Sequence, residues 1–273
     1  MSAAAKLKLS PALKQLIALP SAKGAALPSP PPAAFKSLFD NIRHKGERGG
    51  IGRETWLTLG TAALFTVNSP DAVCQLFNYA SEGNDTKGKV DVASVMRETG
   101  LKCISFNGIP RSINNLNALH SHLPEEVLQN INEEPQRVPD SIPKLYERGL
   151  SLWDGIYEPH SKKLIAKLTA SHPDLAVHIL NSHYGPLLSD PAPQPGIYQL
   201  GRVLTSVVAI AALRAQTGVG PQVTSHVYGL KKSILEGGGG NGEVLQGQDW
   251  LTSDDGVSWV IESVDDVAKA VRG

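Results

Sequence analysis

Apolar residues recur along most of the chain at spacings of three and four positions, which is the period of an amphipathic helix. Residues 54–67 are apolar almost all round, so this segment predicts a fully buried helix. Other segments with the helical period predict helices at 11–19, 35–46, 70–80, 90–99, 109–122, 124–131, 143–156, 173–180, 199–215, 221–235 and 263–271. Almost no segment alternates between apolar and polar residues, as a half-buried strand would. The pattern therefore predicts an all-α fold.

Residues with strong local preferences predict where several of these helices begin and end. Ser69, Pro70 and Asp71 form a helix start, with a capping hydroxyl, a first-turn proline and an acid near the positive end of the helix dipole. Ser263, followed by two aspartates, predicts the start of the last helix. Gly46 and Gly100 are expected helix ends. A cluster of prolines predicts a loop and a run of glycines predicts a flexible segment, namely Pro186, Pro191, Pro193, Pro195 and residues 237–240.

The first 39 residues contain no acid but five lysines, which is typical of an organelle transit peptide, although arginine is absent. Ser10 and Pro11, with an apolar stripe up to Leu19, alternatively predict a short helix of the folded domain followed by a loop. The prolines within 28–32 predict a stiff connector. A mitochondrial address is therefore expected, with a cytoplasmic location as the alternative.

The order of segments suggests a duplicated helical unit. Ala62-Ala63-Leu64 closes a buried helix shortly before Pro70, and Ala211-Ala212-Leu213 closes another shortly before Pro221. Because identities are few, two ordinary helical hairpins are the alternative. With a proline- and acid-rich linker, the chain divides into an amino-terminal extension, a first repeat, the linker and a second repeat, at residues 1–34, 35–131, 132–143 and 144–273.

Composition excludes several classes of protein. Lysine plus arginine number 26 and so do aspartate plus glutamate, so the chain lacks the basic excess of a nucleic-acid binder. It has no stretch of 18 apolar residues that would predict a membrane-spanning helix. Two cysteines are too few for a disulfide framework or a cysteine-rich zinc site. These figures predict a soluble, intracellular, globular protein.

The segment from Leu204 to Leu213, followed by the segment from Pro221 to Leu230, resembles the carboxymuconolactone decarboxylase and AhpD-like family. Residues 100–119, 153–157 and 172–175 resemble other segments of a fungal two-repeat branch that is described as conserved mitochondrial proteins. The resemblance spans about residues 50 to 270 and is more specific for fold than for activity. It implies an all-α AhpD-like fold in which the two repeats pack as a pseudo-dimer, and a monomer or a small homo-oligomer is then expected.

Redox members of that family use a Cys-x-x-Cys pair, a histidine four residues after the second cysteine, and an upstream glutamate. Here the histidine position is His226, but the cysteine positions fall on Val219 and Gln222 and the glutamate position falls near Val207. In the first repeat the histidine position is Gln75. Because one helical turn must bring two thiols together, dithiol peroxidase activity is not expected.

His226 is the first candidate catalytic residue, because imidazole can exchange protons near neutral pH. A buried histidine that hydrogen bonds to a backbone carbonyl is the alternative. Cys74 is the second candidate, since the dipole of its helix would lower a thiol pKa, but most free cysteines are small buried apolar residues. Tyr228, Arg111 and Gln75 are candidate substrate-binding residues: Tyr228 lies beside His226 in sequence, Arg111 begins a helix and could hold an anion or form a surface ion pair, and Gln75 stands opposite His226 in the repeat.

No cofactor or metal is expected. The histidines lack a His-Glu-x-x-His or Cys/His pattern, and no Gly-Lys-Ser/Thr follows the glycine run. The favoured function is an enzyme that acts on a small organic molecule by acid–base chemistry at His226, with decarboxylase-, lyase- or oxidoreductase-like activity. A one-thiol antioxidant protein and a non-catalytic binding or assembly protein are the alternatives.

Overall fold

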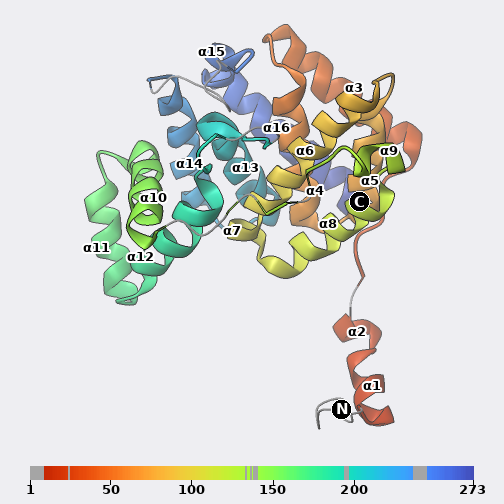
Figure 1. Cartoon of the computed structure of the whole chain (residues 1–273), viewed down its shortest axis with the longest axis horizontal. Helices are drawn as coiled ribbons and strands as arrows, with labels where there is room; N and C mark the ends of the chain where they lie inside the picture. The colour runs from red at the N-terminus through yellow and green to blue at the C-terminus, as the bar shows by residue number, and fades with distance from the viewer. Residues whose placement is uncertain are drawn as a thin grey trace.

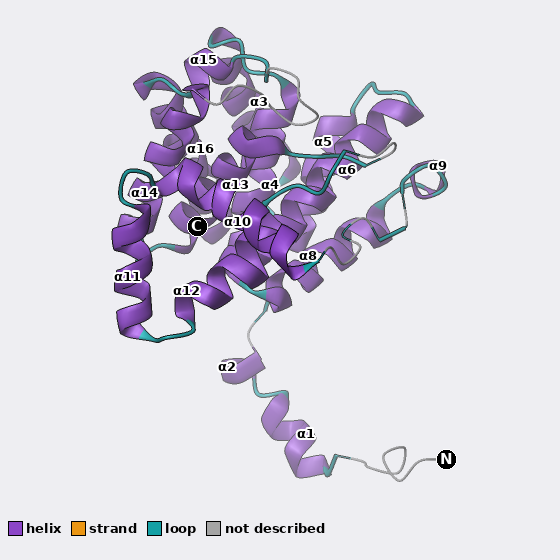
Figure 2. Ribbon diagram, turned by 60° about the vertical axis from the view of Figure 1, so that its left-hand side comes forward, coloured by secondary structure: helices purple, strands orange, loops and turns teal. Residues whose placement is uncertain are grey.

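The computed structural model describes residues 9–23, 25–132, 134–135, 137, 141–193, 197–235 and 245–273. Within these ranges every regular element is a helix and none is a strand (Figure 2), which confirms the predicted all-α class. None of the described helices is long and apolar enough to cross a membrane. The predicted glycine run at 237–240, Pro195, and residues 133, 136 and 138–140 of the predicted linker lie outside the described ranges.

Figure 1 colours the helices in chain order, from red at the amino terminus to blue at the carboxyl terminus. The first half of the chain contributes α1 (Pro11–Ile17), α2 (Pro20–Lys23), α3 (Pro32–Arg48), α4 (Arg53–Val67), α5 (Pro70–Ser81), α6 (Thr86–Lys102), α7 (Ile104–Asn107), α8 (Ile109–His122) and α9 (Glu125–Leu128). The second half contributes α10 (Ile142–Tyr157), α11 (Ser161–Ser171), α12 (Leu175–His178), the π-helix η2 (Ile179–Leu188), α13 (Gly201–Gln216), α14 (Gly220–Lys232), the short 3₁₀ helix η3 (Ser233–Leu235), α15 (Gln248–Leu251) and α16 (Asp254–Arg272).

Helices α4 and α13 form the centre of the molecule and pack against each other, with α16 covering both. Every residue of α4 from Thr55 to Val67 is buried, as its nearly continuous apolar sequence predicts. The main apolar cluster draws residues from both halves of the chain, and the indole Nε1 of Trp259 donates to the carbonyl of Ile42 at 3.1 Å. The two halves therefore share one main core.

A smaller apolar cluster joins α10 to η2 and α11 at one side of the molecule. Its buried members are Trp153, Ile156, Leu180, Tyr184 and Leu188. The π-helix contains Pro186, where the sequence predicted a loop, so that prediction was wrong. In a π-helix the hydrogen bonds run over five residues rather than four, so the proline ring does not meet the carbonyl that it would clash with in an α-helix.

Glycine at position 185 permits the close crossing of α10 and η2. A Cβ added there would lie 2.4 Å from the carbonyl oxygen of Leu145, well inside van der Waals contact with backbone that cannot rotate away. We expect Gly185→Ala to lower the free energy of unfolding by about 1–3 kcal/mol, because the two helices must separate. Urea denaturation measures the change in the free energy of unfolding. Gly83→Ala is not a suitable control, because the backbone φ angle of Gly83 is positive. Gly220→Ala is the suitable control, since a Cβ at Gly220 meets nothing within 4 Å.

The helix ends predicted at Gly46 and Gly100 and the helix start predicted at Ser263 were wrong. Helices α3 and α6 continue through Gly46 and Gly100, where the absence of a side chain admits the Trp259 and Phe65 rings instead of ending the helix. Helix α16 begins at Asp254, because Ser253 accepts a hydrogen bond from the Gly256 amide at 3.2 Å. Ser263 is buried in the middle of this helix.

The serine before α5 also acts differently from the prediction. Ser69 makes no side-chain cap, and its hydroxyl instead donates to the carbonyl of Leu27 at 2.8 Å. Helix α11 was not predicted, since its lysines and alanines give only a weak apolar stripe. In contrast, Ser10 caps α1 as predicted, accepting from the Leu13 amide at 3.2 Å. Helix α1 buries none of its side chains and stands away from the helical body in Figures 1 and 2.

Candidate functional site

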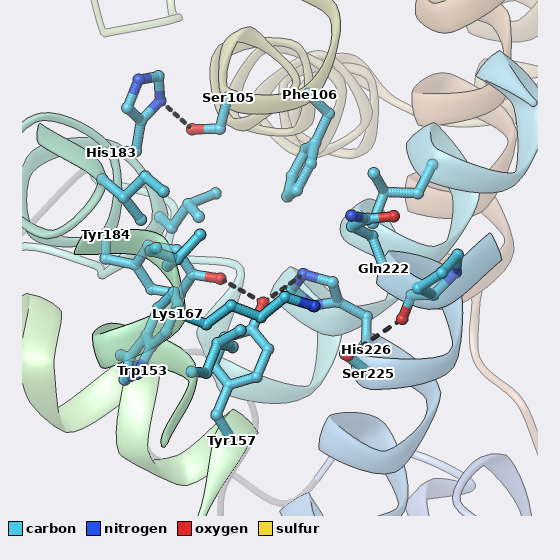
Figure 3. Close-up of a pocket in the computed structure, with 16 residues that line it drawn as sticks. Ser105, Phe106, Trp153, Tyr157, Lys167, His183, Tyr184, Gln222, Ser225 and His226 are labelled. Atoms are coloured by element: carbon cyan, nitrogen blue, oxygen red, sulfur yellow. Dashed lines mark hydrogen bonds between the residues drawn. The ribbon is translucent and has the colours of Figure 1, made fainter. Parts of the chain in front are cut away.

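A cavity of about 430 Å³ lies where α7, α10, α11, η2 and α14 meet (Figure 3). Its walls are mainly apolar, and each of these five elements contributes at least one polar group. The lining residues are Ser105, Phe106, Trp153, Tyr157, Leu164, Lys167, Leu168, Ile179, His183, Tyr184, Leu188, Leu213, Pro221, Gln222, Ser225 and His226. A mostly apolar hollow with a few convergent polar groups is typical of a small-molecule site.

His226 lies near the middle of α14 and is the buried end of a chain of hydrogen bonds. Its side chain is 4% exposed, and its Nε2 lies 3.4 Å from the hydroxyl of Tyr157. The Tyr157 hydroxyl lies 3.0 Å from the hydroxyl of Tyr184, so the two tyrosines and the imidazole form one continuous line in Figure 3. The Phe106 ring packs edge-on against the imidazole, with ring centroids 5.9 Å apart. Among the described residues the Nδ1 of His226 has no hydrogen-bond partner.

Burial keeps this line of groups uncharged. It lowers the pKa of His226 to about 3, and the nearby Arg202 guanidinium contributes in the same direction. Burial also raises the pKa of Tyr157 and, more strongly, that of Tyr184. At neutral pH the site therefore presents a neutral imidazole and two protonated phenols, which can exchange hydrogen bonds and protons without a resident charge.

The lowered pKa of His226 predicts a loss of stability in weak acid. Below pH 6.5 the histidine of the unfolded chain takes up a proton, whereas the folded protein does not until the pH approaches about 3. Folding is therefore disfavoured progressively as the pH falls through this window, by about 2 kcal/mol between pH 7 and pH 5. Urea denaturation at both pH values measures the loss, and His226→Gln should remove this share of it. Equal pH dependence in the two proteins would contradict the assignment.

His183 on η2 lines the cavity and packs against His178, the last residue of α12, which does not line it. Residues five apart share a face of a π-helix, so His178 and His183 pack with ring centroids 5.3 Å apart although α-helical spacing would separate them. The Nδ1 of His183 lies 3.2 Å from the hydroxyl of Ser105 on the opposite wall. Burial, and next the charge of His178, lowers the pKa of His183. Neither here nor elsewhere in the described part of the chain do three His, Cys, Asp or Glu side chains cluster as a metal site would need.

The other predicted site residues do not line this cavity. Tyr228 follows His226 on α14 but points outward and is 64% exposed, as its spacing of two residues requires. Arg111 donates to the carbonyl of Thr66 at 2.7 Å and so caps the carboxyl end of α4. Gln75 donates to the Ser29 hydroxyl at 2.7 Å and to the Pro30 carbonyl at 3.2 Å, which fastens the amino-terminal segment to α5.

Cys74 does not have the lowered thiol pKa that its place near the start of a helix suggested, which favours the alternative of a partly buried apolar residue. Burial, followed by the negative charge of Asp71, raises its pKa, which outweighs the effect of the helix dipole. Its Sγ lies 3.5 Å from the Ala118 carbonyl, so the thiol is a weak donor to α8. Cys103 is fully buried, and burial raises its pKa as well.

The sequence did not identify Tyr157 or Tyr184 as site residues. Tyr157 is four residues after Trp153 on α10, so both rings lie on the face that closes the cavity, and their centroids are 4.1 Å apart. That spacing was visible in the sequence, but it is also the spacing of ordinary core residues. Tyr184 could not be placed without knowing that its helix has the π period.

Comparison with known proteins found no matching family profile and no matching solved structure. The chain is similar to Peroxisomal protein 2 of Saccharomyces cerevisiae, with 29% identity over 154 residues. The match covers 49% of this chain and 52% of the yeast protein, so it spans about half the length of the curated relative.

Proposed function

We propose that this chain is an enzyme that acts on a small organic molecule by acid–base chemistry at His226. The observation that carries the proposal is the hydrogen-bonded line from Tyr184 through Tyr157 to His226 along the wall of an otherwise apolar cavity. A histidine packed away from any cavity would favour a non-catalytic protein. His226 instead lines a cavity and has a polar partner, as an enzyme requires.

The chemistry best suited to these groups forms an enolate. The neutral imidazole would take a proton from a carbon next to a carbonyl, or would return one after loss of carbon dioxide. The Tyr184 hydroxyl can donate to Tyr157, which leaves the Tyr157 proton for the developing oxyanion of the substrate. Negative charge beside the imidazole would raise its pKa from the low value of the empty cavity and make it a stronger base.

An AhpD-like fold with two repeats belongs to the same proposal. The matched helices α4 and α13 pack against each other, and each is followed by a helix that begins with a proline near its start, α5 and α14. Helices α6 and α16 then pack on α4 and α13 respectively. Such an arrangement is what two fused copies of one helical unit would produce. In the first copy, Gln75 hydrogen bonds to Ser29 and Pro30. The amino-terminal segment would therefore occupy the position that corresponds to the His226 site.

The function is tested by following proton exchange and decarboxylation by NMR in heavy water. The panel contains small 2-oxo acids, β-keto acids and lactones, each incubated with the wild-type protein and with Leu168→Trp. Leu168 lines the cavity and makes no hydrogen bond through its side chain, so the larger ring should block binding while leaving His226 in place. We expect turnover of at least one compound by the wild-type protein and none by the blocked variant. Equal rates for both proteins would reject a catalytic role for the cavity.

A mitochondrial address remains part of the proposal, supported by the exposed helix α1 with its apolar residues Leu13, Leu16 and Ile17. The name of the yeast relative suggests the peroxisome as a second location to examine. We expect a carboxyl-terminal fluorescent fusion to colocalise with mitochondria, and deletion of residues 1–25 to abolish that signal. Fluorescence in peroxisomes or cytosol from the full-length fusion would contradict the mitochondrial assignment.

A further inference from the structure

A second hollow of about 580 Å³, the outer hollow, adjoins the His226 cavity, which is the inner one. The two share the lining residues Tyr157, Leu164, Lys167 and Ser225, so they lie side by side, and His226 lines only the inner one. Tyr228, which does not line the inner cavity, lines the outer hollow. Both hollows thus have mainly apolar walls, and most of the basic side chains line the outer one.

The outer hollow is basic. Lys163, Lys167 and Lys232 line it together with His160, whereas Glu158 is its one acidic lining residue. Lys232 is held in place by donating to the carbonyls of Ile156 and Glu158, at 2.5 and 2.7 Å. Lys163 and Lys167 are exposed, and neither forms an ion pair with any described residue.

The helix that carries these lysines has an unusual charge at its start. The first turn of α11 contains Lys162 and Lys163 and no acid, although the positive end of a helix dipole ordinarily favours acids. One acidic residue, Asp154 on α10, hydrogen bonds to the start of α11: its carboxylate accepts from the Ser161 hydroxyl at 2.5 Å. The lysines and the helix end therefore attract an anion to the mouth of an apolar cavity.

We propose that the two hollows together bind one anionic amphiphile, with its apolar body in the His226 cavity and a carboxylate or phosphate head between Lys163 and Lys167. This inference rests on the proposed function and specifies its substrate class. The apolar body would pack against Phe106, Leu168 and Ile179, which line only the inner cavity. The head would remain at the surface, where lysine ammonium groups bind it without full loss of water.

Isothermal titration calorimetry at low salt tests the proposal with five probes: octanoate, octyl phosphate, 1-octanol, acetate and inorganic phosphate. We expect the two charged eight-carbon probes to bind, and 1-octanol to bind roughly tenfold more weakly, because it lacks the contacts to two lysines. Comparing octanoate with octyl phosphate identifies the preferred head. Acetate and phosphate should not bind measurably, since the apolar body supplies most of the binding free energy.

Variants then locate the two ends of the ligand. The double variant Lys163→Gln, Lys167→Gln should weaken binding of both charged eight-carbon probes by roughly tenfold and leave 1-octanol unchanged. Lys162→Gln, which removes a neighbouring charge that lines neither hollow, should have little effect. Leu168→Trp should abolish binding of all three eight-carbon probes.

Two results would overturn the inference. One is equal affinity for 1-octanol and octanoate, which would leave an apolar cavity site without an anion site. The other is the absence of binding by both charged probes. Neither result decides whether His226 is catalytic, because the NMR panel tests that separately and includes lactones, which carry no charge for the lysines to bind.

Discussion

Replacing His226 by glutamine is expected to reduce turnover of the substrate found in the NMR panel by about 10²–10⁴-fold, the usual contribution of a positioned acid–base group. Glutamine has similar bulk and can still hydrogen bond to Tyr157, but it cannot take up a proton at this pH. The proposed duplication also places a glutamine, Gln75, opposite His226 in the first half of the chain. Thermal melting at pH 7 should change little, because the packing against Phe106 is kept.

The matched control for this variant is His120→Gln, the same change at an exposed histidine on α8. It should leave both turnover and melting as in the wild-type protein. His226→Ala serves as a comparison, since it leaves the Tyr157 hydroxyl with one buried partner fewer and should cost about 1–3 kcal/mol of stability. Full turnover by His226→Gln would remove His226 from the chemistry and favour a binding protein.

Replacing Lys102 by methionine is expected to lower the free energy of unfolding by about 3–5 kcal/mol, the cost of leaving one partner of a buried ion pair alone. The Lys102 side chain is fully buried, and its Nζ lies 2.7 Å from an Asp190 carboxylate oxygen. It also donates to the Leu188 carbonyl at 2.5 Å. Because the other Asp190 oxygen accepts from the Gly201 amide, this lysine joins α6 to the end of η2 and the start of α13.

Urea denaturation of the variant measures this loss, and a second substitution tests its cause. Lys102→Met combined with Asp190→Asn should regain part of the stability, since no uncompensated charge then remains. Arg214→Gln is the control for an exposed ion pair: Arg214 and Asp265 are each nearly half exposed, so its effect should stay below about 1 kcal/mol. Similar losses for Lys102→Met and Arg214→Gln would show that burial does not determine the strength of the inner pair.

The sequence predicted most helices because their apolar stripes directly reflect the face that each buries. It did not predict features that depend on a distant partner. Gly46 and Gly100 could not be assigned to helix packing without knowing which rings lie against them. The start of α16 could be found locally, since Ser253, Asp254 and Asp255 repeat the same signal that was assigned to Ser263.

The candidate site was predictable only at His226, the one position where the family resemblance and the side-chain chemistry agreed. Tyr157 and Tyr184 meet that histidine because α10 and η2 cross closely, which no local pattern expresses. Arg111 and Gln75 have residue types that suit ligand binding, yet their side chains hold a helix end and a neighbouring segment. The burial of Lys102 could not be predicted either, because a lysine in a sequence is ordinarily expected to be exposed.

The position of α16 has a consequence for when the chain can fold. This last helix covers α4 and meets α3, and Trp259 hydrogen bonds to a residue 217 positions earlier. During synthesis, the apolar faces of α3 and α4 therefore stay uncovered until α16 (Asp254–Arg272) has been made. A nascent or carboxyl-terminally truncated chain exposes these faces to aggregation and to chaperones. The core around α4 is complete only when α16 has been synthesised and has packed against α3 and α4.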